Sequence, residues 1–340
     1  MEQRRVGASG LRISRLGLGT MTWGRDADEH ECADSLRAFL TAGGTLLDTA
    51  PGYGDGVAEE VVGKLLDKLA DPVADRDELV LATKGGIRPS VADGRSDRRG
   101  AARRVDVSRK GLLDALDASL RRLRTDRVDL WQVHTWSEDS PLDETLSALD
   151  TAVSSGRARY VGVCNYSGWQ TAHAVTLQRS WPGHTPLVST QVEYSLVQRG
   201  VEREVLPAAE FLGLGVLPWS PLGRGVLTGK YRHGTPADSR AASPRFSSYV
   251  ERYLDDRSRR VVDAVCTAAE GLGITPAHVA LAWVRDAPGV SAPLLGARTA
   301  AQLRAILPAE EVGLPPEIRA ALDDASAPHL GYPDAGRLRR

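Results

Sequence analysis

Short apolar runs alternate with amphipathic segments along almost the whole chain, and this alternation restricts the fold more than any other feature. The apolar runs have the length and the Val, Leu and Ile content of buried strands. They are residues 16–18, 45–47, 79–83, 128–133, 159–163, 187–192, 215–218 and 291–294. Strands that alternate with helices predict a parallel sheet covered by helices on its outer side.

Between these runs, apolar residues recur at helical spacing. In residues 108–123, Leu112, Leu116 and Leu120 share one face, and Ser108 is placed to cap the helix N-terminus. Further helices are expected at residues 29–42, 57–69, 141–154, 168–178, 201–212 and 257–270. Residues 4–13 predict an N-terminal β-hairpin, and residues 315–340 a C-terminal helix and tail.

Eight strand–helix units without an intervening linker predict a single α/β domain over residues 1–340, built as a (β/α)8 TIM barrel. A doubly wound open sheet is the alternative that the pattern leaves open. Two polar segments, residues 88–104 and 223–250, follow the third and the seventh strand. In a barrel they form long βα loops at the C-terminal face, where barrel enzymes hold their active sites.

Composition excludes several classes of protein. The net charge is −1, with 43 basic and 44 acidic residues, so we expect no nucleic-acid or membrane partner. No apolar run approaches the roughly 18 residues of a transmembrane helix. Three widely separated cysteines indicate neither a disulfide framework nor a metal site. The first ten residues do not resemble a signal peptide, and a cytoplasmic protein is expected.

Residues 45–54, with the sequence TLLDTAPGYG, form an apolar strand that ends in a carboxylate and opens into a Gly/Pro turn. This is the pattern of a βα loop at a barrel mouth, and it makes Asp48 and Tyr53 candidate site residues. Seen alone, Asp48 could equally cap the turn and Tyr53 fill the loop.

The next two strands end in further polar residues. The third ends LVLATKGG and places Lys84 at its C-terminal end, and the fourth, VDLWQVHTW, ends in His134. Lys84 could be a surface lysine and His134 a structural histidine. Only five of the 43 basic residues are lysines, however, so a lysine at a strand end needs a specific explanation. Lys84 and His134 are therefore expected on the same face of the barrel as Asp48 and Tyr53.

These residue types together favour acid catalysis at a carbonyl group. A phenol with a pKa of about 10 is a weak acid at neutral pH unless a cation stabilises its phenolate. Lys84 can supply the cation, Asp48 can hold Lys84, and His134 can orient a carbonyl oxygen. We find no nucleophile–base pair and no metal-spaced histidines. Protonation of a developing alkoxide requires a hydride donor, so we expect a redox cofactor and no metal.

The segment LGLGTMTWG is not a dinucleotide fingerprint, because Thr22 stands where the third glycine would be. Residues 296–299 are a better phosphate site, since a helix N-terminus offers backbone N–H groups and Arg298 adds a cation. The alternative is an ordinary cap at Thr299. After the seventh strand, Trp219 could stack on a flat ring, or pack in the core, and Arg224 could meet a pyrophosphate.

At this point the chain resembles the aldo-keto reductase superfamily over nearly its whole length. The segments LGLGTMTWG, LLDTAPGYG, ATKGG, VDLWQVH, VGVCNYS, QVEYSL, SPLGRGVLTGKY and LLGARTAAQL follow the order and spacing of that family. The bacterial and potassium-channel β-subunit-like branches share the long SPLGRGVLTGKY segment. The resemblance implies a (β/α)8 barrel that binds NADPH/NADP+, with NADH less expected, without a Rossmann motif.

The resemblance also implies roles for individual residues. Tyr53 would donate the proton, Lys84 and Asp48 would tune it, and His134 would orient the substrate. The cofactor-binding residues implied are Thr20, Asn165, Gln191, Trp219, Ser220, Pro221, Leu222, Gly223, Arg224, Gly296, Arg298 and Gln302. Trp23 and Trp136 are expected to shape the substrate pocket. The chain departs from the family pattern at Cys164, where serine is usual, and at Ile306, where asparagine often contacts adenine.

The expected function is NADPH-dependent reduction of an aldehyde or ketone. An NADPH-binding redox-sensing or regulatory subunit with slow turnover is the alternative, and a lyase or isomerase barrel fits less well. Arginines in residues 88–104 could attract an anionic substrate, but the aspartates among them fit a solvated loop better. The substrate and the oligomeric state stay open.

Overall fold

The computed structural model describes residues 1–68, 76–88, 105–237, 239–243, 247–329 and 331–332. Eight parallel strands follow one another around a sheet in the order β10-β3-β4-β5-β6-β7-β8-β9. The strands are β3 (Gly17–Gly19), β4 (Leu46–Asp48), β5 (Val80–Gly85), β6 (Val128–Val133), β7 (Ala158–Cys164), β8 (Leu187–Glu193), β9 (Gly215–Trp219) and β10 (Leu294–Leu295).

The ends of this sheet meet. A parallel bridge joins Val216 of β9 to Val290, and the N–H of Ser291 donates to the Val216 carbonyl at 2.9 Å, just before β10 begins. The (β/α)8 barrel is therefore confirmed over the open sheet. The last strand is shorter than residues 291–294 predicted, because Pro293 has no amide N–H for the ladder.

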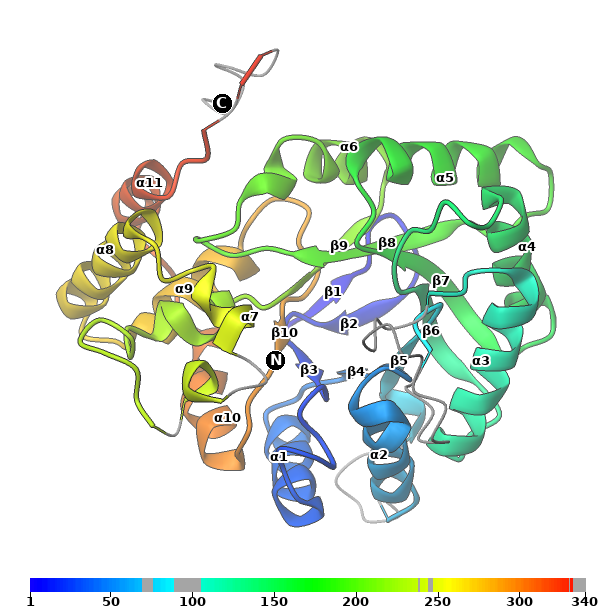
Figure 1. The fold of residues 1–340 in the computed structure, drawn as a ribbon, viewed down its shortest axis with the longest axis horizontal. Helices are drawn as coiled ribbons and strands as arrows, with labels where there is room; N and C mark the ends of the chain where they lie inside the picture. Colours follow the sequence, from blue (N-terminus) through cyan, green and yellow to red (C-terminus); the bar gives the residue numbers. More distant parts are fainter. Residues whose placement is uncertain (69–75, 89–104, 238, 244–246, 330, 333–340) are drawn as a thin grey trace, which may run out of the picture.

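Helices surround the barrel (Figure 1). They are α1 (Glu29–Thr41), α2 (Val57–Lys68), α3 (Arg109–Leu123), α4 (Leu142–Ser154), α5 (Gly168–Ser180), α6 (Val205–Leu212), α7 (Ser247–Glu251), α8 (Asp256–Leu272), α9 (Pro276–Arg285), α10 (Ala300–Ile306) and α11 (Pro316–Ala325). Ser108 caps α3 as predicted, accepting from the Gly111 N–H. Helix α9, in which nearly every side chain is buried, was not predicted from the sequence.

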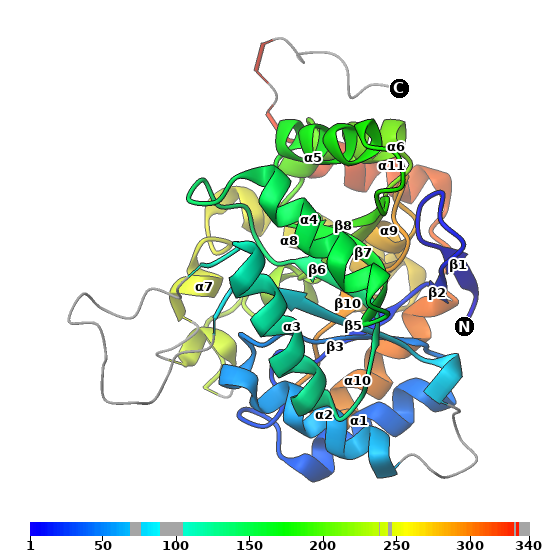
Figure 2. The same cartoon turned by 90° about the vertical axis from the view of Figure 1, so that its right-hand side faces the viewer.

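The predicted N-terminal hairpin is present as β1 (Gln3–Arg5) paired antiparallel with β2 (Arg12–Ser14). It lies at one end of the molecule, opposite α7 (Figure 2). Val6, Leu11 and Ile13 pack in one cluster with barrel-interior residues such as Leu46 and Leu130. The hairpin therefore closes the N-terminal end of the barrel and leaves the C-terminal end for the site.

Side-chain alternation along the strands divides the core into two layers. Leu46 of β4 and Ala82 of β5 belong to the barrel interior, whereas their neighbours Leu47 and Leu81 pack outward against the helices. Because successive residues of a strand point to opposite faces, the residues two positions further along point inward again. Those residues are polar, and they form the site described below.

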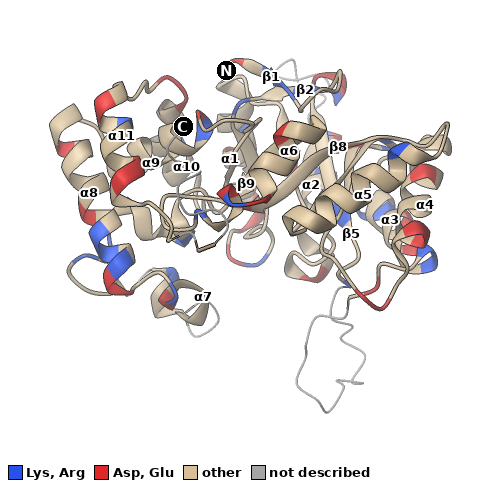
Figure 3. Ribbon diagram, turned by 90° about the horizontal axis from the view of Figure 1, so that it is seen from above, with Lys and Arg blue, Asp and Glu red and all other residues tan. Residues whose placement is uncertain are grey.

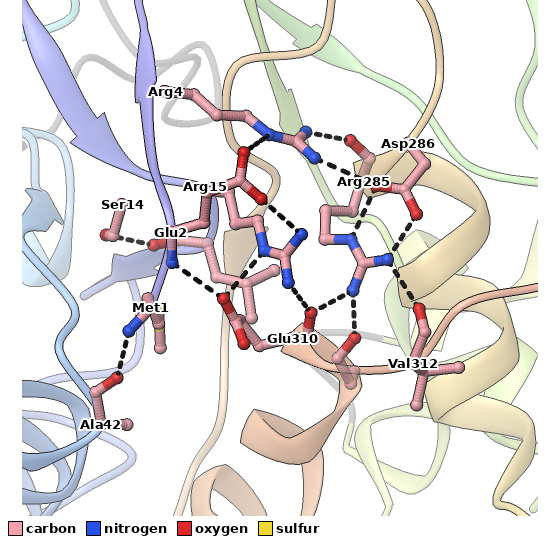
Figure 4. A network of polar contacts seen from close by, with 12 residues as sticks. Met1, Glu2, Arg4, Ser14, Arg15, Ala42, Arg285, Asp286, Glu310 and Val312 are labelled. Atoms are coloured by element: carbon pink, nitrogen blue, oxygen red, sulfur yellow. Dashed lines mark hydrogen bonds and ion pairs between the residues drawn. The ribbon is translucent and has the colours of Figure 1, made fainter.

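An ion-pair network fastens the hairpin side of the barrel to the C-terminal part of the chain (Figure 4). Arg15 bonds the carboxylates of Glu2 and Glu310 at 2.8 Å each. The buried Arg285 at the end of α9 donates to the carbonyls of Glu310 and Val312 at 2.6 Å. Its guanidinium thus joins the end of α9 to the backbone that follows α10.

Basic and acidic residues are interspersed on the outer helices, for example on α8 (Figure 3). Within the described ranges, the structure contains no helix with both the length and the apolar character needed to cross a membrane. In the same ranges, His, Cys, Asp and Glu side chains form no group of three or more that could hold a metal ion. Of the polar segment 88–104, only Arg88 belongs to the described residues.

Candidate active site

A cavity of about 580 Å³ opens at the C-terminal ends of the strands. Three of the predicted catalytic side chains, Asp48, Tyr53 and His134, line it. The predicted cofactor residues that line it are Asn165, Gln191, Trp219, Ser220, Pro221, Leu222, Arg224, Gly296, Arg298 and Gln302. Residues from widely separated parts of the chain are thus brought to one concave site, as expected for the mouth of a barrel.

Tyr53 reaches the cavity through a tight turn after β4. The turn continues into a short 3-10 helix, Gly54–Gly56, in which Gly54, Asp55 and Gly56 have φ angles of 58°, 57° and 97°. Glycine adopts this left-handed region without steric cost, which explains why the turn is rich in glycine. The turn carries the chain out of the barrel and places Tyr53 above the barrel mouth.

Lys84 is the centre of the polar site. Its Nζ lies 2.6 Å from Asp48 Oδ2, 2.9 Å from the Thr49 carbonyl and 3.3 Å from Tyr53 Oη. An ammonium group has three donors, and these contacts use all of them. Lys84 and Asp48 are 0% and 2% exposed, so their charges face each other away from water.

Burial and these neighbours change the protonation of the site. Burial raises the pKa of Tyr53 to about 12, against the opposing effect of the Lys84 charge. Burial is the largest single effect and would lower the pKa of Lys84, but the Asp48 carboxylate and the other acidic groups around Lys84 together outweigh it, and the pKa is raised. Tyr53 is therefore a neutral phenol beside a fixed cation, and the Lys84 charge lowers its pKa by less than burial raises it.

His134 is buried beside Tyr53, with the ring centroids 6.1 Å apart and the planes at 85°. Asn165 Nδ2 donates to the His134 carbonyl at 2.9 Å, and Trp219 Nε1 donates to Asn165 Oδ1 at 3.0 Å. Asn165 itself has a φ of 58°. These bonds fix both ends of the Asn165 amide and hold the Trp219 indole at the edge of the cavity.

Two further buried residues complete the floor of the site. Gln191 Nε2 donates to Asp48 Oδ1 at 2.9 Å, so both oxygens of the Asp48 carboxylate have a partner. Cys164, at the end of β7, is 1% exposed, and burial raises the pKa of its thiol. The thiol therefore stays protonated close to the Asp48–Lys84 pair.

Arg224 differs from the expectation that it would meet a pyrophosphate. Its Nε and Nη2 donate to the two carboxylate oxygens of Glu193 at 2.9 and 2.8 Å. Nη1 donates to the Tyr249 carbonyl at 2.7 Å, and the guanidinium carbon lies 3.3 Å from the centroid of the Tyr249 ring. The charge of Arg224 is thus balanced inside the protein, and it holds α7 against the end of β8.

The turn before α10 was expected to offer backbone N–H groups to a phosphate. The structure pairs three of these groups with side chains: Arg298 N with Gln302 Oε1 at 3.1 Å, Gln302 N with Thr299 Oγ1 at 3.2 Å, and Ala300 N with Glu31 Oε2 at 2.7 Å. Thr299 is the helix cap. A phosphate near this turn would therefore depend on side-chain cations.

Besides Lys84, four predicted residues lie outside the cavity lining. Thr20 is buried and donates to the Asp48 carbonyl through both its N–H and Oγ1, at 3.0 and 3.2 Å. Gly223 has a φ of 55° and packs against Val197. The remaining two are the expected substrate-pocket residues: Trp23 is 1% exposed, and Trp136 packs edge-on to Tyr166 and Trp169.

Several residues that line the cavity were not predicted from the sequence, chiefly Lys230, Arg240 and Tyr249. The scarcity of lysine is a signal that could have identified Lys230, because it applies to this residue as it does to Lys84. Arg240 and Tyr249 lie in the long segment after β9, where no period in the sequence indicates which side chains turn inward. Burial, together with the positive charge of Arg298, lowers the pKa of Arg240.

Comparisons with known proteins agree with this geometry. The model of the aldo/keto reductase family matches residues 15–327. An uncharacterized oxidoreductase of Bacillus subtilis, YrpG, is 37% identical over 95% of each chain. A probable voltage-gated potassium channel subunit beta of Oryza sativa is 35% identical over 87% of each. The L-glyceraldehyde 3-phosphate reductase of Escherichia coli K12 is 36% identical over 89% of this chain and 86% of its own. The chain therefore belongs to the aldo/keto reductase family and is an oxidoreductase.

Proposed function

We propose that this protein reduces an aldehyde or ketone to the alcohol with NADPH, and that Tyr53 donates the proton. One observation carries the proposal. The Tyr53 hydroxyl lies at the mouth of the barrel in contact with the Lys84 ammonium group, which is itself paired with Asp48. A neutral phenol beside a fixed cation suits proton transfer to an oxygen that becomes negatively charged in the transition state.

The cavity lining fits a dinucleotide of this kind. Amide and aromatic groups, Asn165, Gln191 and Trp219, line it together with Tyr53, and cationic groups, Lys230, Arg240 and Arg298, also line it. The lowered pKa of Arg240 reflects burial and a neighbouring like charge, both of which a bound phosphate would offset. When bound, NADPH supplies the hydride for the carbonyl carbon.

The side chains have distinct tasks in this proposal. Tyr53 Oη gives its proton to the carbonyl oxygen. Lys84 stabilises the phenolate that remains, and Asp48 keeps Lys84 charged and in place. His134 helps to orient the carbonyl oxygen, and Trp219 provides a flat surface for the nicotinamide. Because the site is buried, these charges act with little screening by water.

A preference for NADPH over NADH is supported by arginines. Arg298 and Arg240 line the same cavity, and the guanidinium group is well suited to bind the additional phosphate of NADPH. Because the backbone N–H groups near α10 are already paired, side chains would have to bind this phosphate. Ile306 and Ala305 also line the cavity and give it an apolar wall.

The test is a screen of purified protein with small aldehydes, sugars, sugar phosphates and ketosteroids, followed by NADPH absorbance. We expect turnover with at least one class. Y53F should keep its NADPH affinity and lose about 100-fold or more of its turnover, on the order of the effect of a general acid. Full activity of Y53F would refute the mechanism. Slow turnover with every carbonyl would instead favour a regulatory subunit, a role that the name of the potassium-channel relative suggests.

A further inference from the structure

The hydrogen bond between Gln191 and Asp48 crosses the barrel. Asp48 ends β4 and Gln191 lies near the end of β8, and these strands stand four places apart in a ring of eight. They are therefore on opposite sides of the barrel. Both side chains are 2% exposed, and Gln191 Nε2 lies 2.9 Å from Asp48 Oδ1.

This contact determines which way the Gln191 amide faces. An ionised carboxylate only accepts hydrogen bonds, so the NH2 group of Gln191 has to face Asp48. The amide oxygen then faces away from Asp48, and Gln191 also lines the cavity. One side chain thus contacts the catalytic carboxylate with one end and is available to the cofactor site with the other.

The contact also restricts the Asp48 carboxylate. Oδ2 accepts from Lys84 at 2.6 Å while Oδ1 accepts from Gln191, so rotation of the carboxylate would break one of two buried bonds. Lys84 uses its remaining donors on the Thr49 carbonyl and Tyr53 Oη. A carboxylate held from both sides therefore keeps the Lys84 ammonium group against the Tyr53 hydroxyl.

We propose that Gln191 is a positioning residue for proton donation: it holds Asp48 so that Lys84 stays in contact with Tyr53, in addition to any contact with the cofactor. The catalytic part of this inference rests on the proposed reductase function. The contact itself does not, and the two can be tested separately.

The chain offers a matched control. Gln132 of β6 is also a buried glutamine of the barrel, with 0% exposure, but its Oε1 accepts from Ser189 Oγ at 3.1 Å. Replacing Gln132 removes a buried amide of the same kind without removing a bond to Asp48. Gln132→Leu and Gln191→Leu are therefore comparable variants.

The first experiment measures thermal unfolding of the protein without cofactor. Q191L should lower the Tm by about 2–4 °C in the wild-type background, since a hydrogen bond to a charged group is lost. In the D48N background, Q191L should lower the Tm by less than half of that amount. Q132L should lower the Tm equally in both backgrounds. Equal shifts for Q191L in both backgrounds would show that the two residues do not interact.

The second experiment uses Q191L alone, with saturating NADPH and carbonyl. We expect kcat to fall about tenfold, with little change in KM for the carbonyl, and the solvent deuterium isotope effect on kcat to rise, because proton transfer becomes slower. Q132L should leave the isotope effect unchanged. A higher NADPH Kd with unchanged kcat and isotope effect would make Gln191 a cofactor ligand only. If none of the carbonyl compounds supports oxidation of NADPH by the wild-type protein, the proposed function fails. The Tm comparison then still shows whether Gln191 and Asp48 interact.

Discussion

The buried Arg224 and the partly buried Glu193 form an ion pair with two parallel hydrogen bonds, of 2.9 and 2.8 Å, beside the candidate cofactor site. Tyr253 Oη also donates to Glu193, at 2.9 Å, and the Arg224 guanidinium stacks on Tyr249. The pair thus joins β8, the turn after β9 and α7. Arg224 adopts a φ of 60°, an unfavourable value for a residue with a side chain, which these contacts offset.

Loss of this pair should loosen the cavity wall. Arg224→Leu leaves the Glu193 carboxylate without its partner, and we expect the free energy of unfolding to fall by about 3 kcal/mol. The guanidinium carbon of Arg224 also lies 5.7 Å from the centroid of the Trp219 ring, so the Kd for NADPH should rise when Trp219 and Tyr249 lose this neighbour. Urea unfolding and fluorescence titration with NADPH measure the two effects.

The double variant Arg224→Leu/Glu193→Leu is the control for this prediction. An apolar pair leaves no buried charge unpaired, so part of the lost stability should return. If the double variant is as unstable as the sum of the two single variants, the ion pair makes no contribution of its own.

The placement of the candidate catalytic residues was predictable from the sequence because strand geometry is regular. Asp48 and Lys84 lie at the ends of apolar strands and His134 directly follows one. The alternation that places Leu46, Ala82 and Leu130 inside the barrel also turns these residues inward. The local sequence indicates both where a strand ends and which of its residues point into the barrel. Barrel topology then brings the strand ends together.

Arg224 and Arg240 were not predictable in this way. Both lie in the long segment after β9, and their partners are far away in the sequence: Glu193 is 31 positions from Arg224, and Gly296 is 56 from Arg240. An arginine next to a glycine turn is equally compatible with a phosphate ligand and with a buried ion pair. Only the tertiary packing of α7 distinguishes the two.

The charges of Lys84 and Asp48 should be required for catalysis, whereas the fold should tolerate the removal of both together. Lys84→Met leaves a buried carboxylate, and we expect a loss of about 3–5 kcal/mol in unfolding free energy and of at least about 100-fold in turnover. In Lys84→Met/Asp48→Leu much of the stability should return while turnover stays low. Recovery of turnover in the double variant would contradict a role for the charges in tuning Tyr53.

The two arginines at the cavity should determine cofactor preference. Arg240→Leu and Arg298→Leu each remove a cation from the lining, so the KM for NADPH should rise by about 10-fold or more while that for NADH changes little. Arg37→Leu, on the exposed side of α1, is the control and should leave both values unchanged. Equal losses with NADPH and NADH would show that neither arginine reads the additional phosphate.

The raised pKa of Tyr53 should make the free energy of unfolding fall at high pH. Its pKa is about 12 in the folded protein, compared with about 10 in an unfolded chain. Above about pH 10 the unfolded chain releases this proton while the folded protein retains it, so stability is complete below that pH and falls as the pH rises toward about 12. By about pH 11 the loss from Tyr53 alone should be about 1 kcal/mol. Urea unfolding of wild type and Tyr53→Phe at about pH 8 and about pH 11 measures it. Wild type should lose more stability than the variant, because a phenylalanine side chain has no proton to release. Equal losses in the two proteins would mean that Tyr53 is not held as a neutral acid.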